Sequence, residues 1–216
     1  MRLMVVVAHP DDEVLGTGAT ILKAIRNHDS VRVVIMNGAN IDSRPNMETD
    51  VAKSHAIIGI TDSKIYDYDN LLLDRRIPDM VKDIETELAD FKPDYVITHF
   101  YGDIHPDHKA VFNATEQAAR LYQRHNGEFR IKGLYCMSIP SSTNWGHDAF
   151  RPDVYVGFDD EIMALKIESL KAYKNVLRHD THPRSERTLV AQATALGSDV
   201  GLLFAEGLKT VWSIYQ

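Results

Sequence analysis

The sequence predicts a single-domain α/β protein with a Rossmann-like, doubly wound, mostly parallel sheet and helices on both faces. In the first half of the chain, short β-branched runs alternate with segments of helical periodicity. Such alternation implies parallel strands joined by right-handed crossovers. No repeat, linker or low-complexity tract interrupts the 216 residues. Residues 1–216 are therefore expected to form one domain with a large core.

The first strand is expected at the apolar run Leu3–Ala8. The helix after it, Val14–His28, has apolar residues that recur close to the helical period of about 3.6. A second strand is predicted over Val31–Met36, before a polar loop at Asn37–Pro45. A second helix follows near Glu48–Ile58, where a glycine ends it.

A weaker third strand is predicted over Lys64–Tyr68. The segment Ile77–Phe91 has one apolar face and is typical of an amphipathic helix. A fourth strand is expected over Asp94–Thr98, and a fourth helix over Pro106–Arg124, where proline suits the first helical position. The second half adds the expected strands Arg130–Met137, Val154–Phe158 and Leu208–Tyr215, and the expected helices Glu161–Arg178 and Thr188–Leu196.

Acidic and histidine residues directly follow two of these strands. His9-Pro10-Asp11-Asp12-Glu13 comes after the first strand, and His105-Pro106-Asp107-His108 comes after the fourth. In the doubly wound order 3-2-1-4-5, strands one and four are neighbours where the strand order reverses, and ligands bind outside the carboxyl ends of the strands there. The fold rule therefore brings the two clusters together.

The two clusters contain a candidate set of metal ligands. His9 and Asp12 lie three residues apart across a strand-to-helix turn, so both can reach one metal, and His108 can complete the set. Two histidines, one carboxylate and an open water position are typical of catalytic zinc. The same ligands suit Fe²⁺ or another divalent metal.

The remaining polar residues of the clusters suit proton transfer. A divalent metal lowers the pKa of a coordinated water to about 7. Asp11, next to Asp12, can take a proton from that water, and His105 can polarise the scissile oxygen or protonate the leaving group. Asp107 can orient an imidazole by accepting its second N–H. In the competing interpretation the acids of the first cluster only complement the helix dipole, and Glu13 is expected to be structural in either case.

Histidines outside the two clusters are expected to contribute less. His28, His55 and His125 fall on predicted helices or at their ends and are expected to be solvated. His99 directly follows the fourth strand, and whether it lines the site stays open. Gly16-Thr17-Gly18 lacks the third glycine of a dinucleotide-binding fingerprint.

Substrate choice is expected to depend on loops at the site edge of the sheet. The candidates are Asn37–Arg44, Asn144–Trp145 and His179–Arg187, where Arg184 and Arg187 could meet an anionic group and where a solvated charged loop is the competing interpretation. Arg44→Ala or Arg187→Ala is expected to alter KM or substrate preference more than metal content.

The bulk composition excludes several classes of partner. A net charge of −7 argues against nucleic acid and against an anionic membrane. Cys136, the single cysteine, lies in a predicted strand and is expected to be an inert buried thiol, which suits a reducing compartment. No signal peptide is visible and no apolar run approaches the ~18 residues of a membrane span. We expect a cytoplasmic protein whose oligomeric state stays open.

The segment Ala8–Glu13, together with His105-Pro106-Asp107-His108, resembles the PIG-L/LmbE family of metal-dependent N-deacetylases. Weaker matches are Thr98-His99, Asp67-Tyr68-Asp69 and Phe204-Ala205-Glu206-Gly207. Members remove acetyl groups from N-acetylglucosamine units. The resemblance implies that His9, Asp12 and His108 hold zinc, that Asp11 is the general base, and that His105 assists at the oxyanion or leaving group with Asp107 behind it. Many members carry an Arg-Gly-Glu-like segment where this chain has Asn37–Arg44, so the reaction type is implied more firmly than the sugar.

The expected function is that of a zinc-dependent amidohydrolase acting on a small N-acetylated amino-sugar molecule. One alternative is a metal-dependent phosphoesterase, which would want two metals about 3.5–4 Å apart or a cluster of Arg and Lys. Another is a non-catalytic metal- or sugar-binding module. Such a module does not need Asp11 and His105 beside the metal, so mutation of these two residues separates the alternatives.

Overall fold

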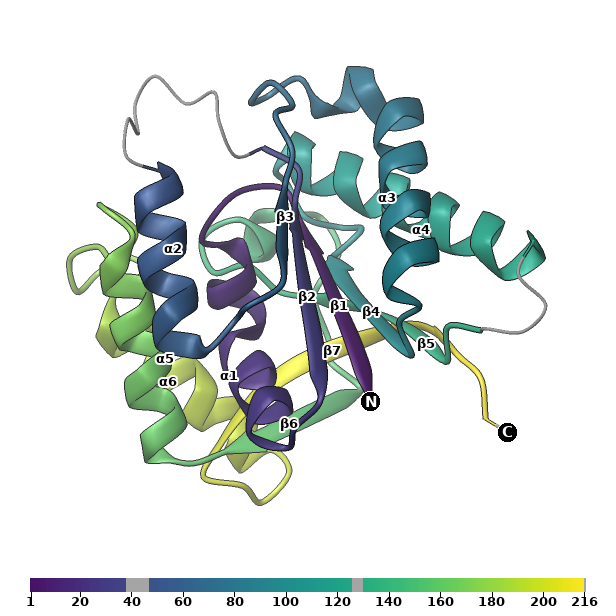
Figure 1. Ribbon diagram of the computed structural model, residues 1–216. Coiled ribbons are helices and arrows are strands. Elements are labelled where there is room, and N and C mark those ends of the chain that lie inside the picture. The colour runs from purple at the N-terminus through teal and green to yellow at the C-terminus, as the bar shows by residue number, and fades with distance from the viewer. Residues whose placement is uncertain (38–46, 126–129, 216) are drawn as a thin grey trace.

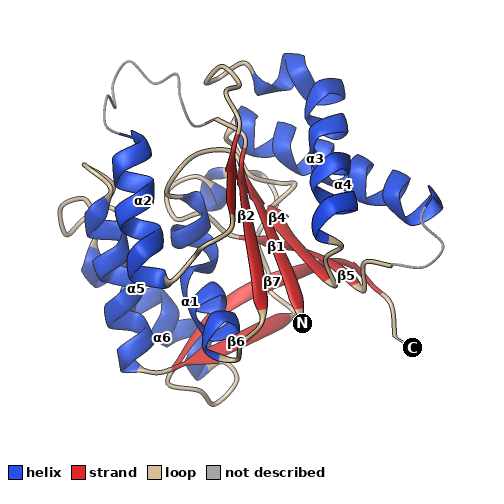
Figure 2. Ribbon diagram, in the orientation of Figure 1, coloured by secondary structure: helices blue, strands red, loops and turns tan. Residues whose placement is uncertain are grey.

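The computed structural model describes residues 1–37, 47–125 and 130–215, which form one seven-stranded sheet with helices on both faces (Figures 1 and 2). The strands are β1 (Arg2–Val7), β2 (Ser30–Ile35), β3 (Ser63–Ile65), β4 (Tyr95–His99), β5 (Gly133–Met137), β6 (Val154–Phe158) and β7 (Phe204–Ser213). The helices are α1 (Asp12–Arg26), α2 (Met47–Ile58), α3 (Ile77–Phe91), α4 (Pro106–His125), α5 (Asp160–Ala172) and α6 (Glu186–Ser198), with the 3-10 turns η1 (Leu73–Arg76) and η2 (Thr143–Trp145).

The strand order is β3-β2-β1-β4-β5-β7-β6. The first five strands of this order are parallel to one another. The predicted order 3-2-1-4-5 is therefore confirmed. The last two strands differ from a simple extension of the sheet, because β7 lies between β5 and β6 and pairs antiparallel with both. That pairing depends on contacts between distant segments, which periodicity along the chain does not reveal.

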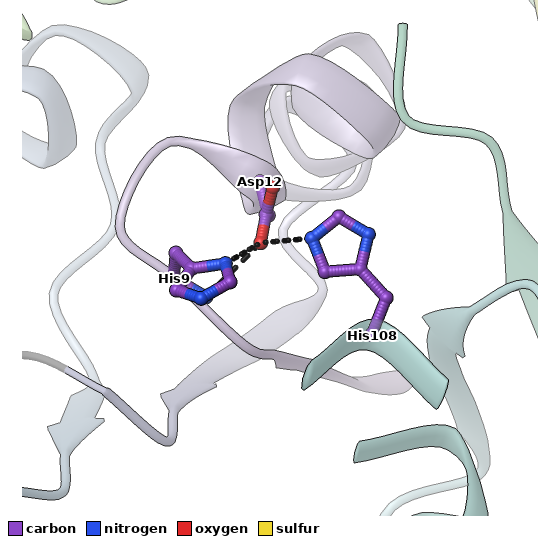
Figure 3. A group of neighbouring side chains, drawn as sticks. All are labelled: His9, Asp12 and His108. Atoms are coloured by element: carbon purple, nitrogen blue, oxygen red, sulfur yellow. Dashed lines mark hydrogen bonds and ion pairs between the residues drawn. The ribbon is translucent and has the colours of Figure 1, made fainter. Parts of the chain in front are cut away.

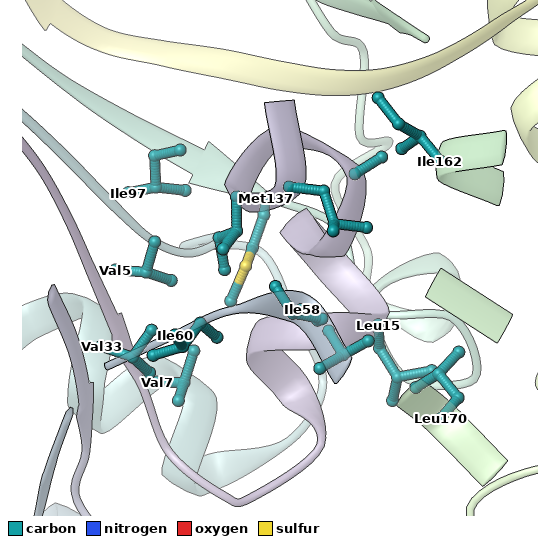
Figure 4. Packing of buried hydrophobic residues seen from close by; sticks show 14 of the residues in the cluster. Val5, Val7, Leu15, Val33, Ile58, Ile60, Ile97, Met137, Ile162 and Leu170 are labelled. Atoms are coloured by element: carbon teal, nitrogen blue, oxygen red, sulfur yellow. The ribbon is translucent and has the colours of Figure 1, made fainter. Parts of the chain in front are cut away.

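Two apolar layers cover the sheet. Leu3, Val5 and Val7 of β1 belong to the apolar cluster that also contains buried residues of α1, α2, α5 and α6, whereas Met4 and Val6 belong to the cluster that contains those of α3 and α4. Figure 4 shows Val5 and Val7 in the first cluster. Successive side chains of a strand point to opposite faces, so a strand between two helical layers must be apolar at every position. This explains the unbroken apolar run at the N-terminus, which leads directly into the first histidine–aspartate cluster.

Helix α5 ends earlier than predicted. It stops at Ala172, six residues before the expected end at Arg178, and Tyr173 has an extended backbone. The side chain of Tyr173 is buried, and its hydroxyl donates a hydrogen bond to Glu13. The helix thus ends where the side chain of Tyr173 enters the core and contacts Glu13 of the first cluster.

Helix α1, which begins at the first cluster, bends at Thr17. The backbone of Thr17 is non-helical (φ −141°, ψ 17°), and the bend frees the amide groups of the following turn. Glu206 of β7 accepts hydrogen bonds from the N–H groups of Ala19 (2.9 Å) and Thr20 (2.7 Å). A carboxylate from another element thus caps the second half of the helix.

The carboxylate of Glu206 is itself held by a buried lysine. Lys166 Nζ of α5 lies 2.6 Å from Glu206 Oε1 and also donates to the Leu15 carbonyl at 3.1 Å. The two side chains are only 9% and 6% exposed. The pair joins α1, α5 and β7 behind the N-terminus of α1.

Removal of the Lys166–Glu206 pair is expected to destabilise the protein. Glu206→Ala leaves the buried ammonium group of Lys166 without a counter-charge and the amide groups of Ala19 and Thr20 without their acceptor, so the free energy of unfolding should fall by about 3–5 kcal/mol. Glu161→Ala is the control, because Glu161 is 73% exposed in its pair with Arg26, and such surface pairs contribute less than about 1 kcal/mol. Urea denaturation gives the free energy of unfolding of both variants. Equal losses would contradict the stabilising role of Glu206.

Cys136 is fully buried in β5, and burial raises the pKa of its thiol to about 12. The thiol is therefore protonated at neutral pH and is not a nucleophile, as predicted. Among the residues that the structure describes, no helix combines the length and apolar character needed to cross a membrane.

Candidate active site

The structure brings the two predicted clusters together where β1 and β4 end. His9 and Asp12 follow β1, and His108 lies on the first turn of α4 (Figure 3). One ligand atom from each of the three residues lies within 4.8 Å of the other two. Asp12 Oδ2 is 3.3 Å from His9 Nδ1 and 3.3 Å from His108 Nε2. The predicted ligand set is therefore a compact group of three.

The charges in this group fit a divalent cation. Asp12 is 1% exposed, and nearby histidines hold the pKa of its carboxyl well below its usual value although burial opposes this. Burial lowers the pKa of His9, but hydrogen bonds to Asp107 and Asp12 outweigh it and raise it to about 10. The charge of Asp12 and the bond to Asp103 likewise raise the pKa of His108 to about 9 despite burial. A divalent metal would replace these imidazolium protons as the positive charge beside Asp12.

His99 lies on the buried side of the group. Its ring is fully buried, and its Nε2 accepts a hydrogen bond from the Ala8 N–H at 2.8 Å. The same nitrogen is 3.6 Å from Asp12 Oδ2, and the ring stacks on that of His108 with 4.0 Å between centroids. His99 thus lines the site as packing beneath the ligands, which resolves the question that the sequence left open.

A second group of possible ligands, His9, His105 and Asp107, is less suited to a metal. His9 Nε2 is already 3.0 Å from Asp107 Oδ2, and His105 Nδ1 accepts the Asp107 N–H at 3.2 Å. Burial and the charges of His108 and His9 lower the pKa of His105 to about 4. His105 is thus a neutral imidazole whose proton sits on Nε2, which makes it a hydrogen-bond donor.

Asp107 lies behind His9, as an orienting carboxylate should. Its Oδ2 is 3.0 Å from His9 Nε2 and accepts the Leu71 N–H at 2.8 Å, while Oδ1 accepts the Leu73 N–H at 3.3 Å. With Nε2 of His9 on Asp107, Nδ1 is the nitrogen that faces Asp12. The sequence predicted that Asp107 can orient an imidazole, and the resemblance placed it behind His105. In the structure its carboxylate pairs with His9, and only its backbone N–H contacts His105.

Asp11 occupies a strained turn. Its φ is 108°, in the left-handed region that non-glycine residues rarely adopt, and its side chain is 2% exposed. The Asp11 N–H donates to Glu13 Oε2 at 3.0 Å. Glu13, which was expected to be structural, thus holds the backbone of Asp11, the proposed base. Strain of this kind persists where the surroundings impose it and is frequent at active sites.

The support of this turn includes a histidine that sequence reasoning placed in solvent. His55 of α2 is 4% exposed and lies 3.4 Å from Glu13 Oε1, which also accepts the Tyr173 hydroxyl at 2.5 Å. The prediction of a solvated His55 is therefore wrong, because its ring is buried in the core beside the carboxylate of Glu13. His28 is exposed; the side chain of His125 lies outside the described part.

Of the loop residues predicted to set specificity, some lie near the site and others are exposed to solvent. Arg184 reaches the site: its Nη1 lies 3.5 Å from Asp11 Oδ2, and its Nε donates to Ser141 Oγ at 2.8 Å. Arg187 is exposed at the start of α6, and Trp145 is 70% exposed in η2. Arg44, with all of residues 38–46, lies outside the described residues.

Sequence reasoning missed Asp103, a fully buried carboxylate in the loop between β4 and α4. Its Oδ2 lies 3.2 Å from His108 Nδ1 and accepts the hydroxyls of Ser142 (2.9 Å) and Thr143 (2.7 Å). The available signal was an aspartate two residues before His105. Its hydroxyl partners come from the loop after β5, about 40 residues away, which no local pattern indicates.

The fold and the site together define an α/β protein that carries a two-histidine, one-carboxylate group where the order of its parallel strands reverses. The chain belongs to the PIG-L family: the model for this family, described as GlcNAc-PI de-N-acetylase, matches residues 4–119. The matched segment contains both clusters.

Solved structures similar to this chain share its whole fold. The conserved protein TT1542 from Thermus thermophilus has a TM-score of 0.81 and 22% identity, over 99% of this chain and 96% of that one. N,N'-diacetylchitobiose deacetylase from Pyrococcus horikoshii has a TM-score of 0.73 and 19% identity, over 97% and 83%. The 4-carboxy-2-hydroxymuconate hydratase GalB from Pseudomonas putida also scores 0.73, with 17% identity over 100% and 98%. One fold thus serves different reactions.

Proposed function

We propose that this protein is a zinc-dependent hydrolase that removes the N-acetyl group from a small molecule containing an N-acetylglucosamine-type sugar. The observation that carries the proposal is the convergence of His9, Asp12 and His108 beside two further groups, Asp11 and His105, that this ligand set does not use. Membership in the PIG-L family and similarity to a chitobiose deacetylase support the same reaction.

The proposed ligands are His9, Asp12 and His108, and Fe²⁺ or another divalent ion fits the same donors. The bound ion would supply positive charge that polarises the amide carbonyl and makes the attacking water more acidic. Asp107 behind His9 and Glu13 behind Asp11 keep the surrounding side chains in place. The chain itself must then move one proton and stabilise one oxygen.

Asp11 is the proposed proton carrier. As water oxygen bonds to the acetyl carbonyl carbon, a carboxylate oxygen of Asp11 accepts the water proton. When the carbon–nitrogen bond breaks, Asp11 returns that proton to the leaving nitrogen, which yields a free amine and acetic acid; the acid then ionises to acetate, and its proton goes to the amine or to solvent. Burial of Asp11 and its place beside Asp12 in the chain support this role.

His105 is the proposed donor to the carbonyl oxygen. The Asp107 N–H occupies its Nδ1, so the proton of the neutral ring is on Nε2. With a pKa lowered to about 4, the ring stays neutral at pH 7, and it donates a hydrogen bond to the developing oxyanion without adding a charge. This favours oxyanion stabilisation over protonation of the leaving group.

The alternatives make different demands on the site. A phosphoesterase with two metals would need a second ligand set, and the second group of possible ligands among the described residues shares His9 with the first. A hydratase, as in the structural neighbour GalB, would release no acetate. A binding module would not depend on Asp11. The test is acetate release from a panel of N-acetylated amino sugars and their conjugates by metal-loaded protein; absence of acetate with every member would contradict the proposal.

Arg184 is expected to tune Asp11 rather than to bind the metal. An adjacent cation favours the ionised form of a carboxyl group, and Arg184 Nη1 is 3.5 Å from Asp11 Oδ2. Arg184→Ala should therefore move the acidic limb of the pH–rate profile to higher pH while metal content is unchanged. Arg120→Ala, on the exposed face of α4, is the control. An unmoved acidic limb in Arg184→Ala would contradict the coupling.

A further inference from the structure

The ring of His108 is held in one plane. The ring of His99 stacks on it with 4.0 Å between centroids and 9° between planes, and the ring of His105 stacks at 4.5 Å and 23°. Stacking fixes the plane of an imidazole, but it leaves open which edge faces Asp12 and which nitrogen carries the proton. A polar partner at the rim of the ring must decide both.

Asp103 is that partner. Its Oδ2 lies 3.2 Å from His108 Nδ1, whereas the other ring nitrogen, Nε2, faces Asp12. The carboxylate is fully buried, and its other hydrogen bonds to described residues are ones that it accepts: His105 N–H to Oδ1 at 2.8 Å, and the hydroxyls of Ser142 and Thr143 to Oδ2. An ionised carboxylate can only accept, and the Ser142 hydroxyl, whose oxygen is also 3.4 Å from His108 Nδ1, donates its proton to Asp103. Both neighbours of Nδ1 therefore accept from it, which assigns the ring proton to Nδ1.

We infer that Asp103 is a positioning residue that fixes His108 with its proton on Nδ1, so that the lone pair of Nε2 is presented to the metal. The inference rests on the proposed metal set of His9, Asp12 and His108. It also gives the loop after β5 a role, because Ser142 and Thr143 hold Asp103 in place. Partners behind a ligating histidine commonly contribute a 10–100-fold change in metal affinity.

Asparagine at position 103 tests the inference, because it keeps the size of aspartate and adds a donor. If its oxygen takes the place of Oδ2, its NH₂ group faces the His105 N–H, donor against donor. If the amide is turned, the NH₂ group faces His108 Nδ1 and favours the tautomer with the proton on Nε2. The turned amide opposes metal binding through Nε2 directly, and the unturned amide weakens the support of His108 because it places two donors against each other.

The experiment compares wild-type protein with Asp103→Asn in two measurements. Competition titration with a chelator gives the Zn²⁺ affinity, which should fall by about 10–100-fold in the variant. Two-bond ¹⁵N–¹H spectra of the histidine rings report the tautomer: zinc-loaded wild type should show His108 protonated at Nδ1, and the variant should lose that signature. A merely structural role would not change which nitrogen is protonated.

Asp153→Asn is the matched control, because Asp153 also accepts several hydrogen bonds, from Thr210 and Lys209, on the β6–β7 side of the sheet. Its Zn²⁺ affinity should equal that of wild type. If Asp103→Asn does not fold, the Ser142→Ala, Thr143→Ala double variant should show weaker Zn²⁺ binding with Asp103 intact.

Wild-type affinity together with an unchanged His108 tautomer in Asp103→Asn, or wild-type affinity in the double variant, would overturn the inference. Failure of the wild-type protein to bind Zn²⁺ would instead contradict the metal assignment. Absence of acetate release with normal Zn²⁺ binding would contradict only the proposed reaction.

Discussion

Asp11→Asn is expected to lower kcat by about 10²–10⁴-fold, the usual contribution of a general base. Asparagine keeps the size of the side chain and tolerates the left-handed backbone that this position requires (φ 108°). It cannot accept the water proton or return a proton to the leaving nitrogen. Because Asp11 is not in the proposed ligand set, the metal content should remain that of wild type.

The measurement is steady-state acetate release by metal-loaded Asp11→Asn, with elemental analysis and thermal unfolding of the same sample. The pH–rate profile should also lose the acidic limb that protonation of Asp11 produces in the wild type. Asp199→Asn, an exposed aspartate at the end of α6, controls for loss of one negative charge. Wild-type turnover in Asp11→Asn would reduce Asp11 to a helix-start acid.

His108→Ala is expected to lose most of the bound metal while the protein stays folded. The variant leaves two of three ligands, His9 and Asp12, and catalytic zinc typically needs three protein ligands. Alanine is the best helix former, so α4 should persist. Asp103 keeps the donors Ser142 and Thr143, which limits the cost of its lost imidazole partner.

Elemental analysis should find about one divalent ion per wild-type chain and much less in His108→Ala, with similar far-ultraviolet circular dichroism. His28→Ala, which changes an exposed histidine in the turn after α1, should bind as much metal as the wild type. Unchanged stoichiometry in His108→Ala would refute the ligand assignment.

The sequence was informative wherever a local rule applied. The apolar runs predict β1 and β4, and the rule for doubly wound sheets places His9 and His108 at one edge of the sheet. Helix α3 was predicted with its observed bounds, Ile77–Phe91, because its amphipathic pattern is strong. These inferences need only periodicity and the order of elements.

The parts that escaped prediction depend on partners distant in the sequence. Glu13 and His55 meet in the core across about 40 residues, so neither the burial of His55 nor its role is visible in local composition. The position of β7 between β5 and β6 is likewise a long-range pairing. Asp103 has no regular pattern around it, and its importance follows only from the side chains that surround it.

Acetate release by one preparation in three states tests the proposed chemistry most directly. The protein is assayed as purified, after exhaustive chelation, and after return of about one equivalent of Zn²⁺, with the N-acetylated amino sugar that gives the most acetate. We expect release to disappear on chelation and to return with the metal. Release that is undiminished in metal-free protein would contradict a metal-dependent deacetylase.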